Sequence, residues 1–372
     1  MKPALTLFLL LNSVLIIGQT TNDILNVLIA NETISQEQAD SIRAESAIKQ
    51  QDADAAKKSF PATASKLIQL SGYSQIRYLN QEEPGKRSGF DIRRVRLDMR
   101  GNITPFFAYR VQTDFADKPK LLDAYGEIKI ANGFNITAGQ FKVPFSMENL
   151  VGSNKMEMID RSQVVEALVA RNKDVIGNQN GRDIGLQAGG GFAYRSGVPL
   201  IEYRLGVFNG SGINVADTAN DAKDVAGRLV LNPVKGLSVG GSSYVGYCKA
   251  LKPDVAGQSQ TRNRFGVEAS YVTNRLSLRG EYIAGRDGKT DRSGWYLQAG
   301  YFIADKKVQL LTRYDTYDPN TSAGNNITTN YAFGGNMNFN SWARLQLFYT
   351  IRDEQGTEIN NNYLAVQFQV GF

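Results

Sequence analysis

The chain contains 372 residues, including 36 glycines, 17 tyrosines and 18 phenylalanines, and its formal charge at pH 7 is +6. It has no histidine and a single cysteine, Cys248, which excludes histidine-based triads, histidine–zinc sites, CxxC redox motifs and intrachain disulfides. Basic and acidic residues alternate without a polybasic block, which argues against nucleic acid as a partner. We expect no metal and no cofactor.

Residues 1–18 have the pattern of a secretory signal peptide, with Lys2 followed by an apolar stretch and the small residue Gly18. A transmembrane anchor is the alternative, but the apolar stretch of about 14 residues is shorter than the roughly 20 that a spanning helix needs. Since no later apolar run approaches that length, the mature chain is predicted to be either an exported soluble protein or a membrane β-barrel.

Residues 19–60 are predicted to form a short periplasmic helical segment. They lack aromatic residues between positions 22 and 58, and their apolar residues fall at helical spacing: Ile24, Leu25, Leu28, Ile34, Ala39 and Ile42. Ser35 and Gln38 fit a capping box at the start of a second helix. Pro61 ends this segment, and the composition then changes sharply.

From residue 65 to residue 372 the hydrophobic period becomes two, which is typical of β-strands that have one apolar face. The last segment is the clearest, with Leu364, Val366, Phe368 and Val370 alternating with polar or small residues. The pattern predicts sixteen strands, over residues 67–80, 89–101, 106–117, 122–131, 134–141, 183–195, 199–208, 223–232, 236–247, 263–273, 275–285, 293–304, 306–317, 327–339, 342–352 and 361–372.

Connections after even-numbered strands are tight and those after odd-numbered strands are mostly longer, as in an up-and-down meander. An even strand number with short turns at one end and longer loops at the other is typical of outer-membrane barrels, whereas a β-sandwich shows no such asymmetry. The predicted fold is therefore all-β, a 16-stranded antiparallel transmembrane β-barrel over residues 65–372. Barrels of this size leave a water-filled channel, so the expected product is a pore in contact with outer-membrane lipid.

The longest connection covers residues 142–182, and a loop of this length in a compact protein is usually functional. We expect it to fold into the lumen as a constriction loop; an external surface loop is the alternative. Its candidate basic residues are Lys142, Lys155, Arg161, Arg171 and Lys173, and its acids, Glu148, Glu157, Asp160, Glu166 and Asp174, nearly balance them.

If the apolar face of each predicted strand contacts lipid, the opposite face lines the lumen. That face carries thirteen basic side chains and eight acidic ones. The densest signal is in residues 89–101, where Arg94, Arg96 and Arg100 share the face opposite to Val95 and Leu97. Same-face residues lie about 7 Å apart along a strand, so these arginines form a column suited to anions. The alternative is that they pair with wall acids such as Asp98, Asp114 and Glu127.

The stretches FDIRRVRLDMRG at Phe90–Gly101 and GQFKVPFSMENL at Gly139–Leu150 resemble the phosphate-selective porin O and P family, and the resemblance covers roughly residues 65–372. It implies a usually trimeric outer-membrane barrel whose arginine column and constriction-loop lysines bind anions. By position, Arg93, Arg94 and Arg96 match the basic strand motif, and Lys142 matches the lysine of the loop motif. Phe372 resembles the C-terminal aromatic residue that the outer-membrane assembly machinery uses.

These observations predict an anion-preferring diffusion channel for phosphate or other small anions, in the outer membrane of a Gram-negative bacterium and with both termini in the periplasm. A general, weakly selective porin is the alternative. An outer-membrane hydrolase is disfavoured because no nucleophile–base motif is visible, and an adhesin is disfavoured because most connections are short. The candidate anion pathway consists of Arg77, Arg93, Arg94, Arg96, Arg100, Arg110 and Lys129.

Overall fold

The computed structural model describes residues 21–31, 33–36, 38–39, 42, 67–215, 222–249, 259–304 and 307–372. The chain divides into two units, Met1–Pro61 and Ala62–Phe372. The predicted signal peptide, residues 1–18, lies outside the described residues. Within the described ranges, every helix is too short or too polar to cross a bilayer.

The N-terminal unit contains helix α2 (Thr21–Ala30), in which Leu25 is buried. The predicted capping box follows it and is confirmed by two reciprocal hydrogen bonds. The Gln38 N–H donates to Ser35 Oγ at 3.2 Å, and the Ser35 N–H donates to Gln38 Oε1 at 2.9 Å. Residues 43–60 of the predicted helical segment lie outside the described residues.

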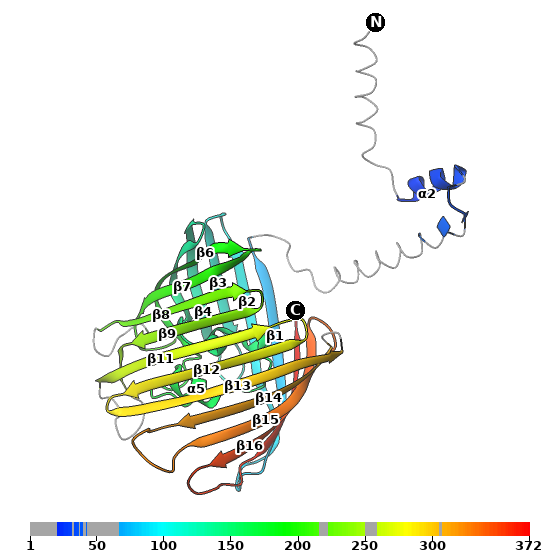
Figure 1. Ribbon diagram of the computed structural model, residues 1–372. Helices are drawn as coiled ribbons and strands as arrows, with labels where there is room; N and C mark the ends of the chain where they lie inside the picture. Colours follow the sequence, from blue (N-terminus) through cyan, green and yellow to red (C-terminus); the bar gives the residue numbers. More distant parts are fainter. Residues whose placement is uncertain are drawn as a thin grey trace. The chain divides into compact units, whose positions relative to one another are not determined.

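The second unit is one closed antiparallel sheet (Figure 1). β9 and β10 form a single wall strand interrupted at Gly246, because both pair with β11. β1 pairs with β2 on one side and with β17 on the other, so the predicted 16-stranded barrel is confirmed. Its strands are β1 (Gln69–Gln81), β2 (Gly89–Asn102), β3 (Phe107–Asp114), β4 (Lys120–Ala131), β5 (Phe134–Lys142), β6 (Arg182–Arg195), β7 (Val198–Phe208), β8 (Asp224–Val234), β9 (Leu237–Val245), β10 (Tyr247–Lys249), β11 (Ser259–Val272), β12 (Leu276–Asp287), β13 (Thr290–Ala304), β14 (Val308–Asp318), β15 (Thr328–Asn338), β16 (Ala343–Glu354) and β17 (Tyr363–Gly371).

Most strand boundaries fall within about three residues of the prediction. The largest difference is at β11, which begins at Ser259 where the sequence predicts residue 263. β12 and β13 also extend toward each other, so residues 288–289 are a tight turn rather than a longer loop. Arg286 and Asp291 pair across this turn at 2.6 Å and support the extension, and Gly288 adopts the positive φ of 59° that the turn requires.

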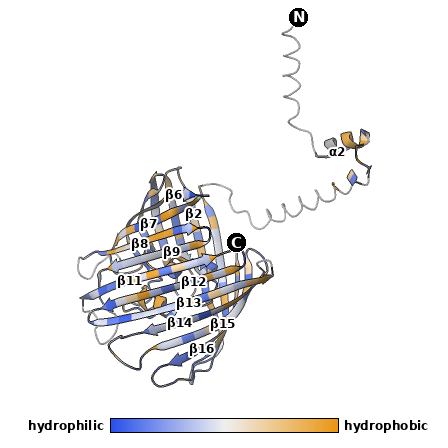
Figure 2. Cartoon of the chain, in the orientation of Figure 1, coloured by the Kyte–Doolittle hydropathy of each residue, from blue (hydrophilic) through white to orange (hydrophobic). Residues whose placement is uncertain are grey.

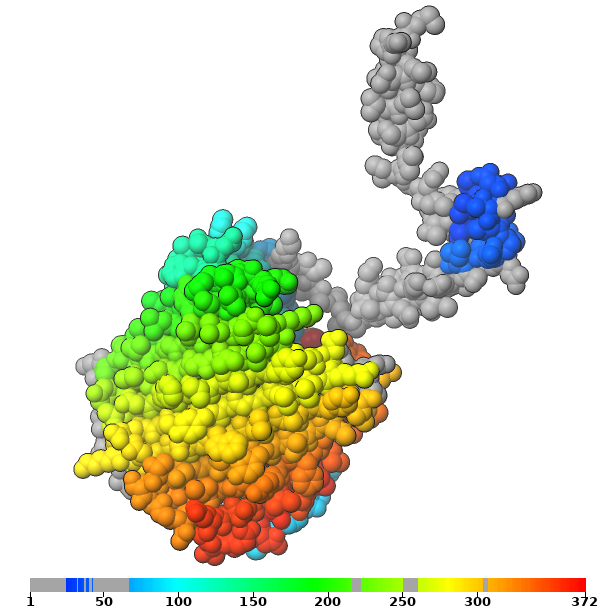
Figure 3. Space-filling model, viewed as in Figure 1, coloured from blue at the N-terminus to red at the C-terminus, as the bar shows by residue number. Residues whose placement is uncertain are grey.

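The outer wall is apolar and the inner wall polar, and β13 illustrates the alternation. Trp295 and Leu297 are 42% and 56% exposed, whereas Tyr296 and Gln298 between and beside them are 2% and 4% exposed. Hydrophobic positions recur along the strands in Figure 2, and Figure 3 shows the neighbouring strands packed side by side across this face. A polar interior within an apolar exterior is the pattern of a barrel that spans a membrane.

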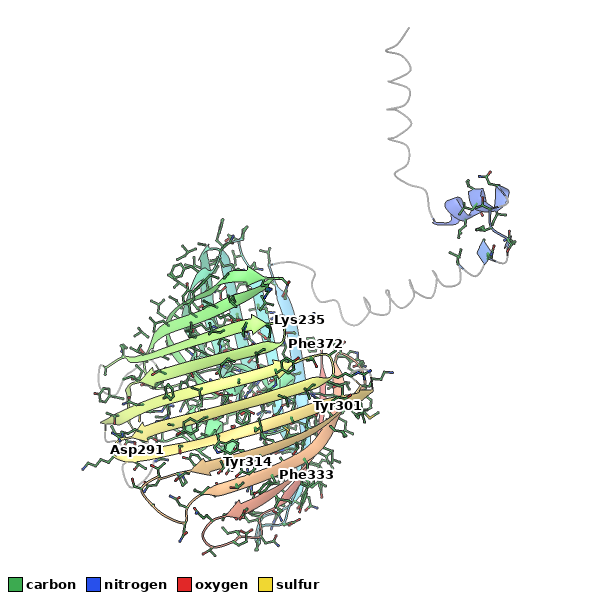
Figure 4. All side chains as sticks on the ribbon, in the orientation of Figure 1. Lys235, Asp291, Tyr301, Tyr314, Phe333 and Phe372 are labelled. Carbon is green, nitrogen blue, oxygen red and sulfur yellow. The ribbon has the colours of Figure 1, made fainter. Side chains whose placement is uncertain are left out.

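Exposed aromatic residues lie near both ends of the wall. Tyr301 and Asp291 mark opposite ends of β13 in Figure 4. Phe106, Phe192, Tyr194, Tyr271, Tyr301, Phe339, Trp342 and Phe372 lie at the short-turn end, and Phe90, Phe115, Tyr247, Trp295 and Tyr331 lie toward the other end. Two aromatic girdles are the usual markers of the two interfaces of a bilayer.

The barrel closes at its short-turn end, where the start of β1 meets the C terminus. The Phe372 N–H donates to the Gly72 carbonyl oxygen at 2.9 Å, and Tyr73 is paired with Gly371. A Cβ at position 72 would lie 2.9 Å from the Phe372 ring, so the glycine makes room for the terminal side chain at the seam.

Candidate functional site

Residues 142–182 lie against the inner face of the wall and contain α4 (Met147–Leu150), η1 (Ser153–Lys155) and α5 (Gln163–Leu168). Helix α5 contacts β12, β13 and β14, and it is visible behind β12 and β13 in Figure 1. Its Val164 and Leu168 belong to one buried hydrophobic cluster with the wall residues Ile283 and Tyr296. The segment is therefore a packed part of the barrel interior.

Four of the five acids of this segment bind wall arginines on different strands. Burial opposes ionisation of Asp160, but the charges of Arg93 and Arg77 lower its pKa to about 2. Asp174 is likewise buried, and Arg262 and Arg264 lower its pKa to about 2. The shortest pairs are Glu148–Arg313 at 3.1 Å, Glu157–Arg279 at 3.2 Å, Asp160–Arg93 at 2.5 Å and Asp174–Arg262 at 2.8 Å.

Two wall carboxylates receive backbone N–H groups at the starts of the two α-helices. Glu281 accepts from Met147 at 3.1 Å and from Glu148 at 2.6 Å. Asp315 accepts from Gln163 at 2.8 Å. The first N–H groups of a helix have no partner within the helix, so these contacts satisfy them and fix the segment to β12 and β14.

Arg93 faces inward because of a β-bulge. Gln75 pairs with Arg94 and Ile76 pairs with Ile92, so Arg93 is the extra residue of β2. Its guanidinium donates to the Ile159 carbonyl oxygen at 2.8 Å as well as to Asp160. Strict alternation would place Arg93 on the lipid face, and the bulge brings it into the interior beside Arg94.

The three arginines of the β2 column differ in the groups that they contact. Arg96 donates to Asp114 at 2.8 Å and to Ser153 Oγ at 3.2 Å. Arg94 donates to Gln75 Oε1 at 2.8 Å and has no salt bridge to a carboxylate among the described residues. Arg100 is exposed opposite Arg110, and within the described ranges it too lacks a salt bridge.

The other residues of the predicted anion pathway also differ in whether a carboxylate neutralises their charge. Arg77 pairs with Asp91 at 2.5 Å, and Arg110 pairs with Asp98 at 2.8 Å. Lys129 is exposed near the short-turn end of β4, with no salt bridge in the described part of the chain. Three of the seven predicted residues, Arg94, Arg100 and Lys129, therefore keep charges that no described carboxylate neutralises.

The predicted basic residues of the segment fall into a buried and an exposed group. Lys142 Nζ donates to the carbonyl oxygens of residues 149, 150 and 151 at 2.6, 3.2 and 2.8 Å. Arg161 donates to the carbonyl oxygens of residues 148 and 151, and Arg171 donates to Asn149 Oδ1 at 2.7 Å. Burial and the neighbouring charge of Arg161 lower the pKa of Arg171 well below its usual value. Lys155 and Lys173 are exposed.

Sequence reasoning missed two features of the interior. Arg182 and Asp123 form a buried bidentate pair, with atoms 2.7 and 3.0 Å apart, at the end of the segment. The inner wall also has apolar side chains at positions where alternation predicts polar ones. They pack against the segment, and they are Phe208, Ile283 and Phe348. This departure from alternation is a signal in the sequence, because an apolar side chain facing an open channel would be exposed to water. Among the described residues, no group of three or more potential ligand side chains is arranged to hold a metal ion.

A closed barrel of sixteen strands with an apolar exterior, aromatic ends and a polar interior is a porin of the outer-membrane type. The sequence matches the model of the family described as phosphate-selective porin O and P over residues 68–250 and 249–372, and the chain belongs to that family. The family and the fold are those of channels.

Solved structures support the fold at low sequence identity. An anion-selective porin from Comamonas acidovorans is 14% identical, with a TM-score of 0.60 over 82% of this chain and 99% of that one. The loop L8 deletion mutant of OmpT, an outer membrane protein of Vibrio cholerae, is 14% identical, with a TM-score of 0.61 over 82% and 99% of the two chains. The trimer form of in-vitro folded OmpT is 12% identical, with a TM-score of 0.59 and the same coverage. No curated protein matched the sequence.

Proposed function

We propose that this protein is an anion-preferring diffusion channel for phosphate or other small anionic solutes in the outer membrane of a Gram-negative bacterium. The observation that carries the proposal is a group of basic side chains with neutral partners. Arg94, Lys142, Arg161 and Arg171 donate to amide or carbonyl oxygens. A neutral oxygen satisfies a donor without cancelling its charge, so the group retains a positive potential.

These charges lie close together. Arg161 is among the charges that act on Arg94, and Arg94 and Arg161 both act on Arg171. Lys142 lies within range of Arg161, Arg171 and Arg182. Rings of arginine and lysine select anions in pores, and the planar guanidinium can donate two hydrogen bonds to one phosphate group.

Residues 142–182 act in this proposal as the constriction loop. Their contacts extend along the inner wall from β11 through β17 and β1 to β2, as the pairs with Arg262, Tyr363 and Arg96 indicate. The remaining free passage is then bordered by β3 to β8, and solutes pass beside the basic group. The pathway would attract anions by the field of several residues rather than by one tight contact.

The orientation and assembly follow from the barrel ends. In outer-membrane barrels the short turns face the periplasm, so we place both termini and the helical segment before residue 60 there. The trimer form of OmpT supports a homotrimer. The terminal strand ending at Phe372 is the proposed signal to the assembly machinery, because its side chain is 56% exposed at the wall end.

A general, weakly selective porin is the second candidate. Arg77, Arg96 and Arg110 have carboxylate partners, which reduces the excess of positive charge along the wall. Under this alternative, the arginines hold the wall together and small hydrophilic solutes of either sign pass.

The test is reconstitution in a planar bilayer, with the reversal potential recorded in a potassium chloride gradient and the chloride current then recorded with inorganic phosphate added. We expect an anion-selective potential and a current that phosphate reduces. Arg94→Gln should weaken both effects, whereas Arg286→Gln, on an exposed turn, removes the same charge and should leave them unchanged. Weak selectivity of the wild-type channel without phosphate block would favour the general porin.

A further inference from the structure

A cavity of about 480 Å³ lies between residues 142–182 and the wall strands β3 to β8. Its lining reaches the short turns, since Asn135 follows the β4–β5 turn and Tyr194 and Pro199 flank the β6–β7 turn. This volume is within the range of small-molecule binding sites and is far larger than an inorganic phosphate needs.

Most charged groups that line the cavity already have partners. Arg110 pairs with Asp98, Asp123 with Arg182, and Arg228 with Glu268. Lys142 donates to three carbonyl oxygens. These groups form the walls of the cavity and leave little capacity for a solute.

Three charged side chains of the lining remain able to bind a solute: Arg204, Glu127 and Glu202. In the described part of the chain, neither Arg204 nor Glu127 has an ion pair or a side-chain hydrogen bond, and Arg204 is exposed to the cavity. Glu202 accepts one hydrogen bond, from Asn232 Nδ2 at 3.0 Å, and this leaves its second oxygen available. The open groups are thus one cation and two anions, which suits a solute that carries both charges.

Their spacing specifies the kind of solute. Glu202 and Arg204 are alternate residues of β7 on the same face, so their Cα atoms lie about 7 Å apart. An extended dipeptide spans about 7 Å, which places its ammonium and carboxylate at matching positions. Glu127 lies close enough to Arg204 for their charges to interact, and it offers a second carboxylate to an ammonium group.

The cavity also has an aromatic side. Tyr125 of β4 and Phe141 of β5 line it, and their rings meet edge to face with centroids 5.8 Å apart. Tyr125 is among the groups that act electrostatically on Arg204, so the rings and the guanidinium border the same space. An apolar side chain of a bound peptide can pack there while its ends reach the charged groups.

We propose that this cavity binds short zwitterionic peptides, with the peptide carboxylate on Arg204, the ammonium on Glu202 or Glu127, and an apolar side chain against Tyr125 and Phe141. The site requires the channel but not the anion preference proposed above, because its ligand has no net charge. The same pore then admits short peptides through a binding site of their own, beside the basic group.

The first experiment uses the wild-type protein in a planar bilayer. Glycylphenylalanine at pH 7 is added to each side in turn, and interruptions of the potassium chloride current are counted. We expect block, with more frequent events from one side, and a half-blocking concentration about fivefold higher for the N-acetyl derivative and for the C-terminal amide, because each loses one charged contact. Absence of block, or equal block by all three compounds, would overturn the proposal.

The second experiment assigns the carboxylate contact. Arg204→Gln should raise the half-blocking concentration of the free dipeptide about fivefold and leave that of the C-terminal amide unchanged, because the amide has no carboxylate to lose. Arg195→Gln removes the same charge from an exposed position at the end of β6 outside the cavity, so it should change neither value. Equal weakening of the dipeptide and the amide by Arg204→Gln would contradict the assigned contact, and unaltered conductance without peptide verifies that the variant folds.

These measurements separate the two proposals. Phosphate block without dipeptide block would remove the peptide site and leave the anion channel. Dipeptide block in a channel without anion preference would leave the peptide site and remove the proposed function.

Discussion

Asp174 is the acid of residues 142–182 whose loss should most clearly release this segment from the wall. Its carboxylate accepts two hydrogen bonds from Arg262, at 3.1 and 2.8 Å, and one from the Ala170 N–H at 2.8 Å. The pKa of about 2, against an ordinary 3.8, corresponds to about 2 kcal/mol at about 1.36 kcal/mol per pH unit. Breaking a buried pair by removing one partner costs about 3–5 kcal/mol, so Asp174→Asn should weaken docking by at least about 2 kcal/mol.

Limited proteolysis measures this loss directly. Lys173 and Arg171 are trypsin sites next to Asp174, and the Arg171 side chain is buried. If opening is faster than cleavage, the cleavage rate follows the open population, and about 2 kcal/mol raises that population about thirtyfold. The same variant should show additional current fluctuations in single-channel recordings, because a loop that undocks changes the free passage.

Asp117→Asn is the matched control. Asp117 lies in the exposed β3–β4 connection at a φ of 59°, a conformation that asparagine tolerates, so the same substitution there should leave cleavage and current unaltered. A wild-type cleavage rate and a quiet current in Asp174→Asn would refute the view that this ion pair holds residues 142–182 in place.

Three further changes test the same picture. Because the pKa values of Asp160 and Asp174 near 2 lie below the ordinary 3.8, their ion pairs stabilise the docked loop above about pH 4 and are lost toward pH 2, so channel noise should rise as the pH falls from about 4 to 2. Leu168→Ala should cost about 2–5 kcal/mol of docking, seen as faster tryptic cleavage, since Leu168 is fully buried. Gly190→Ala would place a Cβ 1.8 Å from a carbonyl oxygen of the β4–β5 turn, so it should lower the midpoint of urea unfolding, whereas Gly89→Ala, with open space around it, should not.

The barrel could be predicted from the sequence because lipid and water impose opposite requirements on the two faces of every strand. In β17, Leu364 and Phe368 alternate with Ala365 and Gln367, which are 0% and 1% exposed. A repeated pattern of this kind predicts where the strands lie, which side chains face lipid, and which connection is long. It does not determine where a strand continues past the membrane, so the extension of β12 and β13 was missed.

The sequence contains a signal for the bulge at Arg93 that a prediction based on strict alternation misses. Ile92 and Val95 are apolar residues three apart, with two arginines between them. Without an extra residue, one of the two arginines would face lipid, where a charge costs about 2–4 kcal/mol at the bilayer midplane. The bulge places both guanidinium groups inside, so the physical cost of the regular strand predicts the irregularity.

The roles of the arginines could not be read from the sequence, because they depend on partners distant along the chain. Arg93 binds Asp160, which is 67 residues away, whereas the adjacent Arg94 binds the neutral amide of Gln75. A count of charges over residues 142–182 gives near neutrality and suggests a weak field. In the folded chain, however, four acids of that segment, Glu148, Glu157, Asp160 and Asp174, bind wall arginines.

These pairings determine which side chains of residues 142–182 keep an uncompensated positive charge. The acids of the segment neutralise anchoring arginines on β2, β11, β12 and β14, while its buried bases contact carbonyl oxygens and its lysines at 155 and 173 are exposed. The same balanced composition therefore attaches the segment to the wall through its negative charges, while its basic side chains contact neutral oxygens or remain exposed. A variant that exchanged the acids for amides would gain net positive charge and yet lose the fixed geometry on which a selective field depends, so selectivity should fall as the formal charge rises.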